Sequence, residues 1–183
     1  GAILLSSGTT GFSRFVVRSS AAIDSVAATN VEEGLACAED DIASFLPMAH
    51  AYGFEHSVLA PILAGATVRA LGSFTIEAAA GALSSGATSL PTIPIAARTL
   101  VEAGCRAPTL RSAVVAGSPL PAAIRAMFEG HFRVPLVDLY GASELGTIWL
   151  DRGSGGRPVR GVEIRLDPVD GLAGSADREI AVR

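Results

Sequence analysis

A run of small polar residues, Ser6-Ser7-Gly8-Thr9-Thr10-Gly11, has the residue types best suited to chemistry in this sequence. Four hydroxyl groups and the unobstructed N–H groups of two glycines can wrap a chain of phosphates. Arg14 follows three residues later and could add a positive charge. The run is not a Gly-x-x-x-x-Gly-Lys phosphate loop, because its glycines are spaced differently and the chain contains no lysine. An ordinary Ser/Thr/Gly surface turn explains the run equally well on its own.

Three further stretches place polar groups directly after apolar segments that are expected to be strands. His50 and Tyr52 follow residues 41–46, Gly117 and Ser118 follow residues 112–116, and Tyr140-Gly141-Ala142-Ser143-Glu144 follows residues 136–139. Ligands of open α/β sheets bind in crevices at the carboxyl ends of the strands. These stretches therefore predict polar groups that share one edge of a sheet.

Each of these stretches also has a purely structural interpretation. A single histidine beside a tyrosine is more often a packed structural residue than a catalytic one. Gly117 and Ser118 fit an ordinary strand-to-helix turn. Ser143 and Glu144 fit a helix cap followed by a first-turn carboxylate, although Glu144 could also help to hold Mg²⁺, which prefers oxygen ligands and substrate phosphates. Taken singly, none of the stretches decides between the two interpretations.

The elements that must position these groups alternate between short apolar strands and helices. This order favours an α/β fold with a largely parallel sheet buried on both faces. After Gly141 the pattern changes to a β-rich tail, and we therefore expect a nucleotide- and acid-binding core over residues 1–150 and a β-rich segment over 151–183. Strands are expected at 2–5, 14–18, 41–46, 66–71, 87–90, 112–116 and 136–140, and helices at 20–35, 55–64, 76–83, 94–103 and 121–129. His56 and His131 fall within these helices and are expected to be structural.

Composition excludes several classes of protein. Fourteen arginines against 18 Asp and Glu give a net charge of −4, which argues against a nucleic-acid binder. The longest apolar stretch, residues 58–68, is too short for the roughly 20 residues of a membrane span. Cys37 and Cys105 are too few for a disulfide framework and are expected to be buried thiols of a reducing compartment, the cytoplasm. Basic residues that are all arginine, together with abundant alanine, suggest a GC-rich bacterial genome.

The order of the motifs resembles the acyl-adenylate-forming superfamily, which includes acyl- and aryl-CoA synthetases, peptide-synthetase adenylation domains and luciferases. The hydroxyl-rich run, Pro-x-x-His-x-Tyr-Gly, Gly-Ser-Pro-Leu and Tyr-Gly-x-Ser-Glu all occur in the family's order. Residues 156–164 resemble the family's Gly-x-Pro-x-x-Gly strand entry, and residues 177–183 resemble its Gly-Glu-Leu-x-Val-Arg segment. The resemblance covers nearly the whole chain.

The resemblance implies a role for each matching residue. Ser6, Ser7, Gly8, Thr9, Thr10 and Gly11 would grip the ATP pyrophosphate, with Arg14 where the family has lysine. His50 would lie beside the acyl carboxylate, with Tyr52, Gly53 and Phe54 near the acid pocket. Gly117, Ser118, Tyr140, Gly141 and Ala142 would surround the adenine, Ser143 would contact the AMP phosphate or the carboxylate, and Glu144 would organise Mg²⁺.

The implied reaction joins a small carboxylic acid to ATP, giving acyl-AMP and pyrophosphate, after which CoA or a carrier-protein phosphopantetheine displaces AMP. Ser13 and Arg14 depart from the family's Pro-Lys, and arginine keeps the charge of lysine without its geometry. The family's ribose-binding Thr-Gly-Asp and its lysine-bearing lobe do not occur within these residues, and both ends fall within expected strands. We therefore expect a central fragment of such a ligase, weak or inactive alone. The alternative is a catalytically silent homologue that binds nucleotide or acyl groups, or serves as a scaffold.

Overall fold

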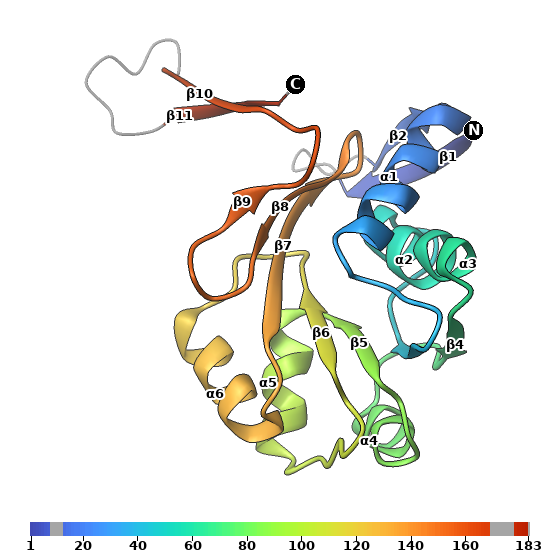
Figure 1. The fold of residues 1–183 in the computed structure, drawn as a ribbon, viewed down its shortest axis with the longest axis vertical. Helices are drawn as coiled ribbons and strands as arrows, with labels where there is room; N and C mark the ends of the chain where they lie inside the picture. The colour runs from blue at the N-terminus through green and yellow to red at the C-terminus, as the bar shows by residue number, and fades with distance from the viewer. Residues whose placement is uncertain (8–12, 169–177, 183) are drawn as a thin grey trace.

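A seven-stranded sheet in the order β4-β3-β5-β6-β7-β8-β9 organises the computed structural model (Figure 1), which describes residues 1–7, 13–168 and 178–182. The strands from β4 to β7 are parallel, and β8 and β9 add an antiparallel edge. Their bounds are β3 (Asp41–Ser44), β4 (Thr67–Ala70), β5 (Ser89–Thr92), β6 (Ser112–Val115), β7 (Leu136–Ala142), β8 (Gly146–Asp151) and β9 (Arg157–Pro158). The expected α/β fold with a largely parallel sheet is confirmed.

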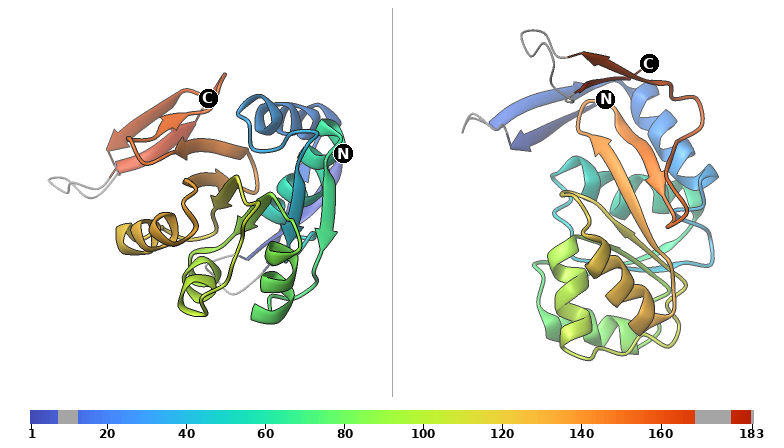
Figure 2. Two further views of the ribbon diagram at one scale, coloured as in Figure 1. Left: turned by 60° about the horizontal axis from the view of Figure 1, so that its bottom comes forward. Right: turned by 90° about the vertical axis from the view of Figure 1, so that its left-hand side faces the viewer.

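Helices cover both faces of this sheet, which explains why its central strands are apolar on both sides. On one face lie α4 (Ile76–Ser84), α5 (Pro94–Glu102) and α6 (Ala122–Phe132), coloured green to orange in Figure 2. They enclose a core that includes Leu83, Leu90 and Phe128. The opposite face packs against α1 (Ser20–Glu32) and a helical segment made of α2 (Ala51–Phe54), η1 (Glu55–Leu59) and α3 (Ala60–Ala64).

The helix ends follow from local chemistry. Ser19 caps α1, because its side chain accepts a hydrogen bond of 3.1 Å from the Ala22 N–H. Pro94 occupies the first turn of α5, where its missing N–H costs nothing. Gly104 follows α5 with a φ of +65°, the left-handed conformation that often ends a helix. These local features agree with the helices expected at 20–35 and 94–103, although α1 already ends at Glu32 and α5 at Glu102.

Several expected boundaries are wrong. The strand expected at 41–46 ends at Ser44, and the strand expected at 87–90 lies at 89–92. The helix expected at 55–64 already begins at Ala51 and includes a π-helical turn, η1. Strand β8 was not predicted: it pairs antiparallel with β7 and completes a hairpin. Cys105 is buried as expected, whereas Cys37 is exposed.

Two smaller antiparallel sheets complete the structure. At the N-terminus, β1 (Ala2–Ser7) pairs with β2 (Ser13–Arg18). Leu4 of β1 and Val16 of β2 are buried and pack against α2. At the other end, β10 (Ile164–Pro168) pairs with β11 (Arg178–Val182), in agreement with the expected β-rich tail. Within the described ranges no helix is long and apolar enough to cross a membrane. The β1–β2 hairpin thus lies against α2.

Candidate functional site

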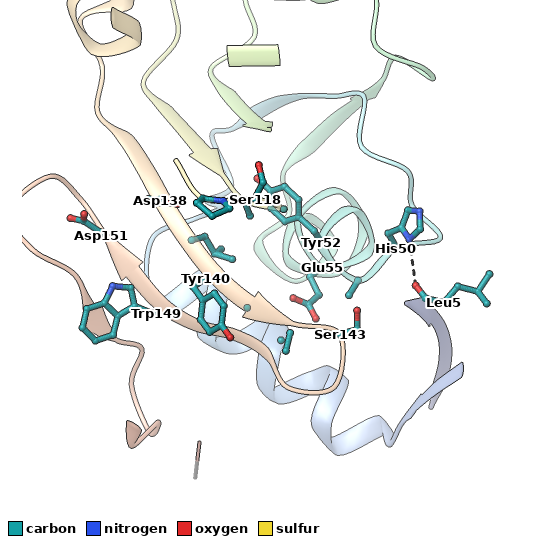
Figure 3. A pocket seen from close by; sticks show the side chains of 18 residues that line it. Leu5, His50, Tyr52, Glu55, Ser118, Asp138, Tyr140, Ser143, Trp149 and Asp151 are labelled. Carbon is teal, nitrogen blue, oxygen red and sulfur yellow. Dashed lines mark hydrogen bonds between the residues drawn. The ribbon is translucent and has the colours of Figure 1, made fainter. Parts of the chain in front are cut away.

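A pocket of about 770 Å³ lies where the carboxyl ends of β6 and β7 meet α2 and the end of β1 (Figure 3). Its walls come from segments that are far apart in the sequence. The residues that line it are Leu5, His50, Ala51, Tyr52, Glu55, Ala116, Gly117, Ser118, Pro119, Asp138, Leu139, Tyr140, Gly141, Ala142, Ser143, Gly146, Trp149 and Asp151. The common sheet edge predicted from the sequence is thus a real cavity.

One wall of the pocket, the sheet wall, consists of residues 116–119 after β6 and residues 138–143 of β7. Gly117 turns the chain out of β6 with a φ of +89°, a conformation that favours glycine. Tyr140 is half exposed, and an irregularity in the β7–β8 register falls between it and Gly141. An exposed aromatic face beside glycine backbone suits a flat ring that stacks on the tyrosine.

The other wall, the helix–hairpin wall, carries His50, Tyr52 and Glu55 from the helical segment and Leu5 from β1. His50 immediately precedes α2, and its Nδ1 lies 3.4 Å from the Leu5 carbonyl oxygen. The Tyr52 hydroxyl group donates to the Val114 carbonyl oxygen at 2.7 Å and accepts from the Thr92 N–H at 3.2 Å. Burial raises the pKa of Tyr52. Tyr52 therefore fastens α2 to β5 and β6, and only its ring is available to a ligand.

A buried ion pair stands behind this wall. Arg18, the last residue of β2, donates from Nη1 to Glu55 Oε1 at 2.5 Å and from Nη2 to the Ala22 carbonyl oxygen at 3.2 Å. The two side chains of the pair are only 4% and 5% exposed. Burial raises the pKa of the Glu55 carboxyl group to about 7, and Arg18 opposes that rise. The pair joins the hairpin to the helical segment that carries His50.

Acidic groups stand at the far end of the pocket. Asp138 and Asp151 line it, and Arg125 from α6 pairs with Asp151 at 3.2 Å and with Asp138 at 3.9 Å. Burial raises the pKa of Asp138, with Arg125 opposing the rise and Asp151 adding to it. Trp149 of β8, the partner of Tyr140 in the β7–β8 register, lies nearby. This end therefore offers hydrogen-bond acceptors beside aromatic rings.

The structure brings together eight of the residues singled out in the sequence. His50, Tyr52, Gly117, Ser118, Tyr140, Gly141, Ala142 and Ser143 all line the pocket. Gly8, Thr9, Thr10 and Gly11 lie outside the described residues, whereas Ser6 and Ser7 end β1 and pair with Arg14 and Ser13 of β2.

Four other predicted site residues do not line the pocket. Arg14 is exposed in β2, and Glu144 is exposed in the turn between β7 and β8. Gly53 is packed so closely that an added Cβ would lie 2.2 Å from the Pro47 carbonyl oxygen. Phe54 packs against Leu4 and its neighbours in the small core beneath the hairpin.

Ten of the lining residues were not predicted as site residues, and five of these carry a charge, an aromatic ring or a contact to His50: Leu5, Glu55, Asp138, Trp149 and Asp151. Asp138 carried a usable signal, since it is a carboxylate within an otherwise apolar strand, two residues before Tyr140. Trp149 and Asp151 could not be found without the prediction of β8. Glu55 gave no signal, because it lies in a stretch that was expected to be an ordinary helix.

A metal site of protein ligands alone is not present among the described residues, where no group of three or more His, Cys, Asp or Glu side chains could hold an ion. Mg²⁺ needs less than that when a nucleotide is bound, because it usually takes one or two carboxylates together with phosphate oxygens and water. The exposed carboxylate of Glu144, next to the pocket residue Ser143, fits that limited requirement.

Comparisons with known proteins agree with this geometry. A family model described as AMP-binding enzyme matches residues 2–174. A search of curated proteins finds no match. Among solved structures, a malonyl-CoA ligase with methylmalonyl-CoA and AMP bound is 28% identical, with a TM-score of 0.84, and the match covers 99% of this chain and 42% of that one.

Two further solved structures have the same fold. VinN in complex with L-aspartate is 25% identical with a TM-score of 0.77, and the match covers 90% of this chain and 45% of VinN. O-succinylbenzoate coenzyme A synthetase (MenE) from Bacillus subtilis, in complex with AMP, is 21% identical with a TM-score of 0.83, and the match covers 99% and 49%. This chain spans less than half the length of each of these three structures.

Proposed function

Because this chain belongs to the AMP-binding enzyme family, we propose that it supplies the nucleotide- and acid-binding part of a ligase that activates a carboxylic acid with ATP. One carboxylate oxygen of the acid attacks the α-phosphorus of ATP. A carboxyl-oxygen-to-phosphorus bond forms, the bond to the bridging oxygen breaks, and pyrophosphate leaves with the electron pair. The task is mainly one of positioning and charge stabilisation.

The sheet wall is where we place the nucleotide. Tyr140 offers a ring face for adenine, and Gly117 lets backbone approach the other side of the base. The adenine base would also contact Ser118, Gly141 and Ala142. Asp138 adds an acceptor for the exocyclic amino group of adenine, because its carboxylate lies in the same wall. AMP bound in the malonyl-CoA ligase and in MenE supports this placement at the level of the family.

The helix–hairpin wall is where we place the acid and the phosphates. His50 reaches the pocket from the start of α2 and can hold the reacting carboxylate, with the Tyr52 ring beside the acyl group. Ser143 offers a hydroxyl group to the α-phosphate. Ser6 to Gly11 and Arg14 would grip the pyrophosphate. This placement is supported by Leu5, which precedes Ser6 in β1 and whose carbonyl oxygen lies 3.4 Å from His50 Nδ1. Glu144 would hold Mg²⁺, which neutralises phosphate charge when it is bound.

The remaining parts of the proposal concern the whole ligase. We place it in the cytoplasm, acting on a small carboxylic acid, with CoA or the phosphopantetheine of an acyl carrier protein as the acceptor of the acyl group. Gly53 and Phe54 would shape the acid pocket from behind, through the packing of α2. Residues 1–150 would form the binding core, and residues 151–183 would lead towards a C-terminal lobe that carries the catalytic lysine.

The observation that carries the proposal is the convergence of Tyr140, Gly117 and His50 on one pocket from three separate segments: the end of β7, the turn after β6 and the start of α2. The test is a titration of the chain with AMP by calorimetry, followed by an acid-dependent ATP–pyrophosphate exchange assay. We expect AMP to bind and exchange to be slow. Exchange as fast as that of an intact synthetase would contradict the expected weak activity, and AMP binding without any exchange would favour the silent homologue.

A further inference from the structure

The helix–hairpin wall presents a buried carboxylate to the ligand. Glu55 lines the pocket, whereas its partner Arg18 does not. Arg18 approaches from behind, from the end of β2, and is held there by the Ala22 carbonyl oxygen as well as by Glu55. A ligand in the pocket therefore meets the negative member of the ion pair first.

The ion pair leaves one oxygen of Glu55 unused. Arg18 donates to Oε1, whereas no residue that the structure describes donates to Oε2, which keeps some accessible surface. On the other side, the Arg18 Nε–H is buried without a partner among the same residues. A pair with only a structural role would be expected to satisfy more of these groups, because unpaired buried polar atoms are costly. Figure 3 shows the Glu55 side chain among the labelled residues of the pocket, which Glu55 lines together with His50 and Tyr52.

The free oxygen decides which ligands can cover it. A hydrocarbon group pressed against it would bury a carboxylate oxygen without a hydrogen bond, which is strongly unfavourable. A second carboxylate would meet like charge, since Arg18 is already behind Glu55. A hydroxyl or amino group would instead donate to Oε2, and hydrogen bonds to charged groups are among the stronger ones.

We propose that Glu55 is a specificity-determining residue, which selects carboxylic acids that carry a hydroxyl or amino group remote from the carboxyl group that is activated. Arg18 is a positioning residue that holds the Glu55 carboxylate in the wall. This inference rests on the proposed function, because it assumes that the pocket space beside His50 and Tyr52 receives the acid.

The test compares matched acids that differ in one group. The probes are meta- and para-substituted benzoates that bear amino, hydroxy or methyl groups, and straight-chain acids of several lengths that end in the same three groups. Calorimetry gives the dissociation constant of each acid at saturating AMP. In the best-fitting series we expect the hydroxy and amino acids to bind about tenfold or more tightly than the methyl acid, the effect of one hydrogen bond to a charged group.

Two variants separate recognition from structural support. Glu55→Gln keeps an acceptor without the charge. The preference for hydroxy acids should therefore persist, whereas the preference for straight-chain acids that end in a charged amino group should fall by about tenfold. The double variant Arg18→Leu/Glu55→Leu removes both charges and leaves neither one buried alone. Its preference should reverse, with the methyl acids binding more tightly than their hydroxy and amino counterparts.

The outcomes distinguish failure of this inference from failure of the proposed function. If the chain binds AMP but binds methyl and donor-bearing acids equally tightly, selection by Glu55 is overturned. The same holds if the chain binds AMP but binds none of the acids. A preference for donors that the double variant retains would overturn it too. If the double variant does not fold, the wild-type series and Glu55→Gln decide alone. Absence of AMP binding in the wild-type chain would instead remove the proposed function itself.

Discussion

The two walls of the pocket are built in different ways. The sheet wall is set by backbone pairing: β5, β6 and β7 are in parallel register, with Thr92 opposite Val115 and Val115 opposite Asp138. The helix–hairpin wall is set by side chains that bridge distant segments, namely Arg18 to Glu55 and the Tyr52 hydroxyl group to β5 and β6. The first kind of wall depends on pairing along whole strands, whereas the second depends on a few side-chain contacts.

The largest difference between the walls should appear when the buried ion pair is broken. Arg18→Leu leaves the Glu55 carboxylate buried without its partner, which should lower the free energy of unfolding by about 3–5 kcal/mol. The double variant Arg18→Leu/Glu55→Leu should recover most of that loss, because it removes both charges. Urea denaturation of the two variants and the wild-type chain measures this. Equal losses in the single and the double variant would show that the pair does not hold the wall.

A second test uses pH, because two neighbouring residues of η1 titrate with opposite effects. His56 is buried with no partner for Nε2 among the described residues, and burial lowers its pKa to about 4. Its contribution to stability is present above pH 6.5, the unfolded pKa, and is lost as pH falls towards 4. Glu55, with a pKa of about 7, contributes stability below pH 4.5 that is lost as pH rises through 7.

The two slopes oppose each other between pH 4.5 and 6.5, so each single variant should expose the other residue's titration. Glu55→Gln should lose stability on acidification, by about 3 kcal/mol across this window. His56→Phe should gain a similar amount of stability on acidification over the same range, because only the titration of Glu55 remains. Urea unfolding at several pH values measures both. The same pH dependence in both variants and in the wild-type chain would contradict the assignment.

Tyr52→Phe should have a smaller effect on the helix–hairpin wall. The substitution removes the hydroxyl group that donates to the Val114 carbonyl oxygen and accepts from the Thr92 N–H. The expected loss is about 1–3 kcal/mol in the free energy of unfolding, because two backbone groups are left without that partner. Thermal denaturation measures it. A neutral result would mean that packing of the Tyr52 ring alone fixes α2.

The smallest effect is expected in the sheet wall, at Gly117. Gly117→Ala should cost about 1–2 kcal/mol, because the residue has a φ of +89°. The nearest atom to the added Cβ, Ile93 Cγ2, lies at an ordinary distance of 3.7 Å, so the cost is in the backbone alone. Gly130→Ala in α6 is the matched control, with no neighbour within 4 Å and no positive φ. It should stabilise the chain by about 1 kcal/mol. Unfolding experiments that place both variants on the same side of the wild type would contradict this account.

The contrast between the walls also explains what the sequence could predict. Gly117, Ser118 and Tyr140 directly follow apolar segments, and parallel pairing places the ends of such segments at one edge. Local patterns were therefore enough to place these residues on the sheet wall. The alternation of strands and helices predicted the fold for the same reason, although boundaries at Ser44 and Thr92 were missed by two residues.

The rest depended on contacts that no local pattern encodes. Arg18 and Glu55 are 37 positions apart, and their pairing follows only from the three-dimensional packing of the hairpin on α2. The π-helical turn that contains Glu55 has no sequence signature in the helix expected at 55–64. Strand β8 was missed because Gly146–Asp151 follows directly on the motif that ends β7, and Trp149 and Asp151 were missed with it.

The most direct test of the account is to locate AMP on the chain by backbone amide NMR. We predict that AMP causes its largest chemical-shift changes at Gly117, Ser118 and residues 140–143, which come from two separate strand ends. Smaller changes should reach His50 across the pocket. Changes concentrated on α4 and β4, with none at Tyr140, would contradict the claim that these strand ends enclose one nucleotide.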